Sequence, residues 1–428
     1  MSPATARKQR SGAARAKVPT PDPRPRASVA LRDSSPAAYH LVWVTMLILL
    51  VAGMCMMLSV SVAEGIDGGD KYGYVRTQGI AAAVGLVLLV ILWRFDYRKL
   101  RVISVAFLVA VGLLLILVHI PQFGQTAGGA KSYLKMGPFT LQPSEFAKLA
   151  LVLLGAHLLS SRRARAGDLK AFMWPFGVVG LGMCGMVTFE GDLGTAIIMA
   201  GLLMGMLWLG GMRAGHWLAL TGTGVAAAMA LVLTNGERMS RVFSFLDPSS
   251  DPQGSAYQLG QSLVALGRGG WIGVGPGESV QKFQYLPKAH TDMIFSILGE
   301  EFGLLGAGSV LVLFGVFAFA CWQLARRCSD PMGKYLIAGC GMLVTLQAVV
   351  NIGGVIGALP LTGVPLPFIS YGRSSLVAML MAVGVILAVA RRAPARQAPS
   401  PAVRYENVTR IDRRRRDGGA CGARPSPR

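Results

Sequence analysis

Residues 41–62 read LVWVTMLILLVAGMCMMLSVSV, a run of twenty-two residues without a charged side chain. About 20 mostly apolar residues in a helix cross the hydrocarbon core of a bilayer, which is about 30 Å thick. The sequence therefore predicts an all-α, polytopic membrane protein with about ten transmembrane helices, because nine further apolar runs follow. They lie at about 77–94, 102–120, 143–161, 172–189, 192–211, 216–234, 301–325, 335–358 and 367–391.

The composition differs from that of a water-soluble protein. Hydrophobic residues make up 53% of the 428 residues and charged residues 15%, whereas soluble domains carry about 25% charged residues. A water-soluble multidomain protein is therefore excluded. The six cysteines have no paired spacing and the five histidines have no metal-ligand spacing. The sequence thus predicts neither a disulfide framework nor a protein metal site.

The net charge of +21 is concentrated at the two ends of the chain. Residues 1–40 carry eight basic and two acidic side chains, and residues 391–428 carry eleven and three, so these tails hold 14 of the 21 net positive charges. Both lack the apolar residues that offset the entropy of ordering, and we predict disordered tails at 1–40 and 392–428. Their charge is typical of a cytoplasmic topology signal that contacts anionic lipids. Neither tail interleaves aromatic residues, so no nucleic-acid partner is expected.

The short loops predict the orientation of the chain in the membrane. Lys and Arg cluster after the even-numbered runs, and such clusters mark the cytoplasmic side. An even number of spans places both termini on that side. The connection of about 65 residues between the seventh and eighth runs, at 235–300, then faces outward. Long connections are usually functional or disordered, and its amphipathic stretch at 257–267 argues for order. We therefore expect a structured, catalytic extracytoplasmic loop within a membrane domain at 41–391.

This outer loop ends in His290-Thr291-Asp292, directly ahead of an apolar run. A carboxylate at this place is partly desolvated, and desolvation raises its pKa towards the range that suits a general base. Helix capping is the alternative, because Thr291 or Asp292 could accept hydrogen bonds from free backbone N–H groups. The two roles are compatible with each other.

A second polar motif opens the fourth run, where Gln142-Pro143-Ser144-Glu145 is followed by Lys148. Charged side chains inside a membrane span are costly and by default mark a functional interior. A buried structural ion pair of Glu145 and Lys148 is the alternative. Near the C-terminus, Pro365 and Pro367 break the last run at membrane depth. Irregular backbone is tolerated there where it packs within protein or lines a wet cavity.

Six motifs together resemble those of the SEDS family of polytopic cell-wall polymerases. The resemblance covers roughly residues 40–392, and the stretch Ser279-Val280-Gln281-Lys282 favours the cell-division branch of the family over the elongation branch. The motifs are Gln142-Pro143-Ser144-Glu145, Asp192-Leu193-Gly194-Thr195, Phe245-Leu246-Asp247-Pro248, Gln281-Lys282, His290-Thr291-Asp292 and Pro367-Phe368-Ile369-Ser370-Tyr371-Gly372.

The resemblance implies a peptidoglycan glycosyltransferase that polymerises lipid II into glycan strands on the outer face of the bacterial plasma (inner) membrane, at the division septum. Asp292 is implied as the general base, and polyprenyl pyrophosphate as the leaving group. The other implied site residues all bind substrate. Lys148, Arg76 and Lys282 are expected to face the pyrophosphate, Glu145 to orient Lys148, and Gln142, Ser144, His290 and Ser370 to complete the set.

The partners implied by the resemblance are the nascent glycan strand, a class B penicillin-binding transpeptidase and other membrane proteins of the divisome. No sequence motif binds a cofactor. A divalent cation, Mg²⁺ or Mn²⁺, that bridges the substrate pyrophosphate is chemically compatible with the reaction.

Two other functions stay open at this point. Charged residues inside a span and broken helices also fit a lipid II flippase, and the basic tails fit a non-catalytic scaffold of the divisome. The outer position of Asp292 favours chemistry. Transport would need a polar path into the cytoplasmic half of the membrane, where the sequence offers little beyond His157.

Overall fold

The structure is a computed structural model. It describes residues 36–65, 72–127, 130–136, 139–161, 170, 173–234, 236, 239–240, 245, 255–283, 285–287 and 289–393. The predicted tails therefore lie outside the described residues, apart from 36–40 and 392–393. Most of the Phe245-Leu246-Asp247-Pro248 motif and much of 235–254 also lie outside them.

Every predicted apolar run forms a helix, and the chain is a mostly helical, multi-pass membrane protein. In the described residues, eight helices are long and apolar enough to cross a membrane, and two shorter apolar helices, Met173–Phe189 and Leu193–Leu209, accompany them. The helices that correspond to the predicted runs are α1 (Pro36–Gly65), α2 (Gly73–Arg94), α3 (Leu100–Val118), α4 (Pro143–Ser161), η2 (Met173–Gly177) with α6 (Val178–Phe189), α7 (Leu193–Leu209), α8 (Ala214–Leu233), α11 (Ile294–Arg327), α12 (Pro331–Val355) and α13 (Arg373–Arg392).

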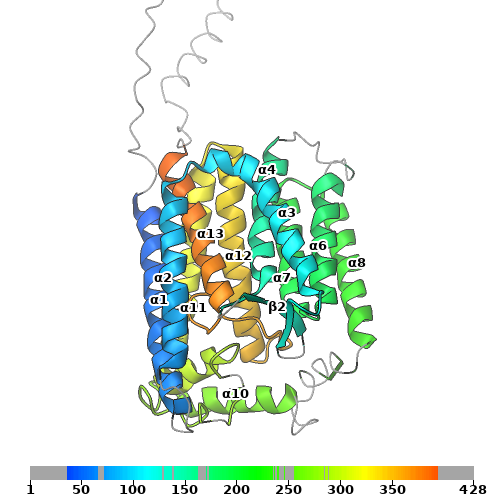
Figure 1. Cartoon of the computed structure of the whole chain (residues 1–428). Coiled ribbons are helices and arrows are strands. Elements are labelled where there is room, and N and C mark those ends of the chain that lie inside the picture. The colour runs from blue at the N-terminus through cyan, green and yellow to red at the C-terminus, as the bar shows by residue number, and fades with distance from the viewer. Residues whose placement is uncertain are drawn as a thin grey trace, which may run out of the picture.

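The helices form a bundle whose centre is α4, α12 and α13 (Figure 1). These three have the largest buried share among the candidate spans, whereas α8 buries none of its residues. In α12, apolar residues such as Leu343 and Val344 are buried together with the polar Gln347 and Asn351. Polar side chains on the central helices are therefore surrounded by protein instead of lipid, which is the setting in which a membrane span tolerates them.

One end of the bundle carries the connections that build the site. Helix α10 (Ser255–Gly269) lies across this end, which we call the α10 end, while α1 begins and α13 ends at the opposite end (Figure 1). A short 3-10 turn, η1 (Tyr97–Lys99), joins α2 to α3. Helix α10 contains the stretch 257–267, which the sequence predicted to be ordered.

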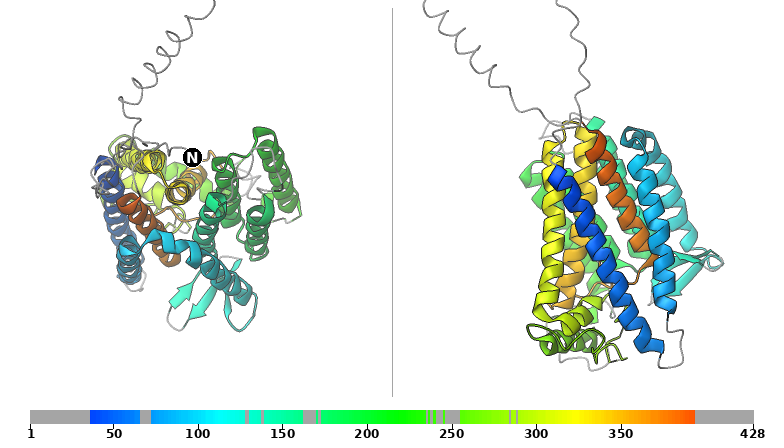
Figure 2. Two further views of the ribbon diagram at one scale, coloured as in Figure 1. Left: turned by 90° about the horizontal axis from the view of Figure 1, so that it is seen from above. Right: turned by 90° about the vertical axis from the view of Figure 1, so that its left-hand side faces the viewer.

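A small antiparallel sheet also lies towards the α10 end and projects from the side of the bundle (Figure 2). Its strands follow the order β1 (Gly124–Ala127), β2 (Ala130–Met136) and β3 (Phe139–Leu141), and Leu134 is in register with Leu141. The prediction of an all-α chain missed this sheet. Its strands are three to seven residues long, too short to give a clear alternating pattern.

The backbone leaves helical geometry at two places near the α10 end. Helix α11 is interrupted at Gly303, where φ is 67°. The segment between α12 and α13 is irregular, with positive φ at Gly363 and Phe368, and α13 begins only at Arg373. The predicted break ahead of the last helix is therefore confirmed, and the predicted start of that helix at 367 is six residues early. Phe368 accounts for the difference, since its φ of 66° is left-handed and cannot continue an α-helix.

Candidate active site

Asp292 lies at the N-terminal end of α11, and only 6% of its surface is exposed. The N-cap of α11 is Met293, which makes no side-chain capping bond, and capping by Thr291 or Asp292 stays a prediction. Thr291 donates its hydroxyl to Oδ1 of Asp292 at 2.9 Å. A Cβ placed on Gly363 would lie 3.9 Å from Oδ2 of Asp292, so the irregular segment before α13 borders the carboxylate.

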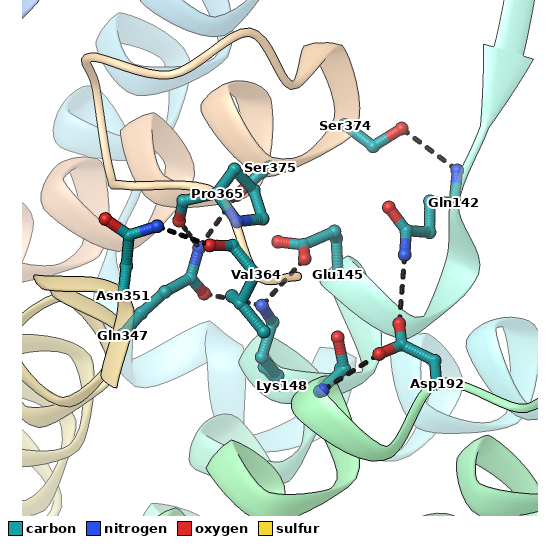
Figure 3. A network of polar contacts seen from close by, with 11 residues as sticks. Gln142, Glu145, Lys148, Asp192, Gln347, Asn351, Val364, Pro365, Ser374 and Ser375 are labelled. Carbon is teal, nitrogen blue, oxygen red and sulfur yellow. Dashed lines mark hydrogen bonds and ion pairs between the residues drawn. The ribbon is translucent and has the colours of Figure 1, made fainter. Parts of the chain in front are cut away.

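Asn351 on α12 joins these two segments. Its Nδ2 donates to the carbonyl oxygens of Asp292 and Val364, both at 2.8 Å. Figure 3 shows the bond to Val364. One helical turn earlier, Nε2 of Gln347 donates to the carbonyl of Pro365 at 2.9 Å and to the hydroxyl of Ser375 at 3.0 Å. Residues four apart lie on one face of a helix, so α12 fixes the irregular segment from a single side.

The predicted contact of Glu145 and Lys148 is present, and both side chains are buried. Nζ of Lys148 lies 2.8 Å from Oε1 of Glu145 and donates to Oε1 of Gln347 at 2.5 Å (Figure 3). The second oxygen of Glu145 has no hydrogen-bond partner in the described part of the chain. Lys148 is 0% exposed, so its ammonium group reaches the bordering segment through Gln347.

The motif ahead of α4 connects to two further helices. The backbone N–H of Gln142 donates to the hydroxyl of Ser374, and its Nε2 donates to Oδ2 of Asp192 at 3.1 Å. Oδ1 of Asp192 accepts from the backbone N–H of Thr195 and caps α7. Burial raises the pKa of Asp192. Ser144 is buried, and its hydroxyl has no hydrogen-bond partner among the described residues.

Glu190, at the end of α6, is a further carboxyl group close to this motif. It is 3% exposed, and neither carboxyl oxygen has a hydrogen-bond partner in the described residues. Burial raises its pKa to about 8, and the nearby Asp192 adds to the shift. This carboxyl group is therefore largely protonated at neutral pH.

Helix α2 contacts the segment before α13 and also His290, two residues ahead of Asp292. Nε2 of Gln78 donates to the carbonyl of Ser370 at 3.0 Å, and the hydroxyl of Ser370 accepts from the backbone of Leu366. The His290 ring stacks on Tyr74 with ring centroids 4.5 Å apart. The backbone carbonyl of His290 accepts from the backbone N–H of Tyr371. The side chains of His290 and Ser370 are thus brought to the segments around Asp292.

Two predicted cations have different surroundings. Arg76, in the first turns of α2, is exposed at the α10 end. Lys282 is 5% exposed and its ammonium contacts Glu301, Ser59 and the carbonyl of Gly277. None of these three contacts belongs to the group around Lys148, so the structure does not bring Lys282 into that group.

Sequence reasoning missed Gln347, Asn351, Gln78 and Ser374, which make most of the contacts between the segments. A signal was present for the first two, because Gln347 and Asn351 are polar residues four apart in an otherwise apolar span. Nothing in the sequence indicates that Asn351 reaches the backbone of Asp292. That contact depends on the path of the irregular segment.

These features define a class: a polytopic membrane protein that holds a buried carboxylate and a buried ion pair at one end of its helix bundle. A family model described as "Cell cycle protein", named for FtsW, RodA and SpoVE, matches residues 39–394. The chain belongs to this family, the SEDS family.

Individual relatives agree with this membership. The chain is 38% identical to stage V sporulation protein E of Bacillus subtilis (strain 168), over 81% of the chain and 94% of that protein. It is 40% identical to a probable peptidoglycan glycosyltransferase FtsW of Nitrosococcus halophilus (strain Nc4), over 77% of the chain and 86% of that protein. The name of the second relative, which further relatives share, confirms the predicted enzyme class, a peptidoglycan glycosyltransferase.

A solved structure is similar as well. It is described as "Structural coordination of polymerization and crosslinking by a peptidoglycan synthase complex" and superposes with a TM-score of 0.68 at 26% identity. The match covers 83% of this chain and 97% of that one.

Proposed function

We propose that the protein polymerises lipid II into glycan strands on the outer face of the bacterial plasma membrane during septal wall synthesis, with Asp292 as the general base. One observation carries the proposal. The nearly buried Asp292 is held by Asn351 against the segment before α13, in a chain of the SEDS family.

The reaction joins two lipid-linked sugars. A sugar hydroxyl of one lipid II attacks the anomeric carbon of the growing strand. The bond from that carbon to the pyrophosphate oxygen breaks, a glycosidic bond forms, and polyprenyl pyrophosphate leaves. Asp292 takes the proton of the attacking hydroxyl. General base catalysis of this kind contributes about 10²- to 10⁴-fold to the rate.

The leaving pyrophosphate needs positive charge. Of the predicted cations, Arg76 is best placed to supply this charge, because it is exposed at the α10 end. Lys148 is buried behind the bordering segment and, with Glu145, holds that segment through Gln347. A cation that stabilises developing negative charge is most effective when it is fixed before the reaction.

A divalent cation fits this chemistry as a companion of the substrate pyrophosphate. In the described residues no three His, Cys, Asp or Glu side chains gather so that they could hold a metal ion. Mg²⁺ or Mn²⁺ would therefore enter with the pyrophosphate oxygens, and its role would be to neutralise their charge.

The α10 end is proposed to face outward and both termini to face the cytoplasm, in agreement with the basic loops and tails. The proposed partners are a class B penicillin-binding transpeptidase and other membrane proteins of the divisome. Support comes from the similar solved structure, which is described as a synthase complex that coordinates polymerization and crosslinking.

A polymerisation assay tests the proposal. The protein is purified with its transpeptidase partner and given fluorescent lipid II in detergent, and glycan strands are separated on a gel. Wild type is expected to form strands and Asp292→Asn to form none. Asp96→Asn is the matched control, because Asp96 caps η1 at the opposite end of α2 and Asn caps equally well.

Three results would contradict the proposal. Polymerisation by Asp292→Asn at the wild-type rate would remove Asp292 as the base. No polymer from wild type, together with movement of lipid II across vesicle membranes, would favour the flippase. A wild-type protein that does neither, yet still binds its partner, would favour the scaffold.

A further inference from the structure

A second buried polar cluster joins three segments near the α10 end. We call it the Lys282 clamp, and it consists of Lys282, Glu301 and Ser59. Nζ of Lys282 donates to Oε1 of Glu301 and to the hydroxyl of Ser59, both at 3.0 Å, and to the carbonyl of Gly277 at 2.5 Å. Ser59 donates its own hydroxyl to Glu301 at 2.6 Å. An ammonium group has three N–H donors, so these three acceptors satisfy all of them.

The adjacent Glu300 makes a parallel set of contacts to the same loop. It is 0% exposed and accepts from the hydroxyl of Ser279 at 2.5 Å. The backbone N–H groups of Val280 and Gln281 donate to the same carboxylate at 3.2 and 3.3 Å. Glu300 and Glu301 together therefore fasten residues 277–282 to α11.

The backbone continues this attachment. The carbonyls of Glu300 and Glu301 accept from the N–H groups of Val274 and Gly275 at 3.0 and 3.1 Å. A Cβ at Gly303 would lie 2.4 Å from the backbone nitrogen of Gly273, so only a glycine lets the loop approach this closely. The break in α11 thus serves to seat the loop against the helix.

The position of the clamp along the chain gives it a role. Asp292 lies midway along the segment that begins at Lys282 and ends at Glu301, so the clamp closes that segment at its base. Ser59 fixes the same point to α1, which packs beside α11 (Figure 2). The loop residue before Asp292 and the α11 residue after it are therefore joined to each other and to α1.

We infer that Lys282 and Glu301 are positioning residues, which hold the segment that carries Asp292 in register with its neighbours, and that Lys282 does not bind the substrate pyrophosphate. The inference rests on the proposed function, because it concerns the placement of the proposed base. A fully hydrogen-bonded, buried ammonium has no donor left for a phosphate oxygen. Displacing a catalytic group by about 1 Å can cost about 100-fold in rate.

The test compares two single variants with their combination. Lys282→Met and Glu301→Leu each leave a buried charge without its partner, and we expect kcat for lipid II polymerisation to fall about 100-fold. KM is expected to stay unchanged, because the substrate contacts are intact. The double variant Lys282→Met/Glu301→Leu replaces the whole pair by apolar groups of similar size. Its kcat is expected within about tenfold of wild type, since such replacements are often nearly neutral.

The control is Glu278→Gln, on the same loop but exposed, which is expected to behave as wild type. A double variant as inactive as Lys282→Met would overturn the inference, since the ammonium would then be needed itself. Single variants that melt at a lower temperature but keep wild-type kcat per folded molecule would overturn it too, because the pair would only stabilise the fold.

If the single variants do not fold, the double variant decides alone: recovered polymerisation supports the clamp and a folded, inactive protein refutes it. Wild type is measured in the same assay. A wild type that forms no glycan strands would contradict the proposed function, which is a different result from a failure of the clamp.

Discussion

Replacing Asn351 by leucine tests how the proposed base is held. The substitution keeps a similar volume but removes the two donors that reach the carbonyls of Asp292 and Val364. Each buried acceptor left without a donor costs about 1–3 kcal/mol. The substitution also removes the Asn351 oxygen, which has no partner in the described residues, and this offsets part of the loss. We therefore expect a loss of about 2–4 kcal/mol of stability.

The loss of activity should exceed what unfolding explains. Without Asn351 the segment before α13 and the N-terminal end of α11 are no longer tied at this point, and a shift of about 1 Å at Asp292 would lower kcat about 100-fold. Unfolding is followed in detergent, and polymerisation is measured per folded molecule. Thr345→Val on the same helix is the control, because within the described part of the chain the Thr345 hydroxyl bonds only its own helix, at the carbonyl of Gly341. If Asn351→Leu unfolded and polymerised like wild type, the two hydrogen bonds would have no role in placing Asp292.

Three further changes have defined outcomes. Lys148→Met leaves Glu145 buried without its cation and is expected to cost about 3–5 kcal/mol of stability, measured by unfolding in detergent, whereas the double variant Lys148→Met/Glu145→Leu should recover most of it. Burial raises the pKa of Glu190 from 4.5 to about 8. Between these two pH values the folded state holds a proton that the unfolded state releases, so the free energy of unfolding falls as the pH rises. Glu190→Gln should remove this slope and gain at most about 5 kcal/mol at pH 9, and an unchanged slope would contradict the shift. Gly303→Ala, at a φ of 67°, should lower the yield of folded protein sharply, while Gly308→Ala, whose added Cβ meets nothing within 4 Å, should not.

The sequence predicted the spans well where lipid or apolar protein surrounds a whole helix. The run 143–161 coincides with α4 because Pro143 suits the first turn of a helix and the following residues are apolar. The eighth run was predicted from 301, whereas α11 begins at Ile294. Its first turns contain Ser296, Gly299 and Glu300, which break an apolar pattern but are buried against other parts of the protein.

In the candidate site, too, some contacts follow from the local sequence and others depend on how distant segments pack. Glu145 and Lys148 are three residues apart on one helix, so their contact follows from helical geometry alone. The partner of Lys282 does not follow from local spacing, because Glu301 is nineteen residues away and Ser59 lies on α1. Contacts of this kind depend on how distant segments pack, and a periodic pattern in the sequence carries no information about them.

The most direct test is the rate at which purified wild type and Asp292→Asn, each with the transpeptidase partner, convert fluorescent lipid II into glycan strands. Binding of lipid II is measured in parallel. If Asp292 removes the proton of the attacking hydroxyl, the variant should bind lipid II normally and polymerise it at least about 100-fold more slowly. Equal rates for the two proteins would contradict a catalytic role for Asp292.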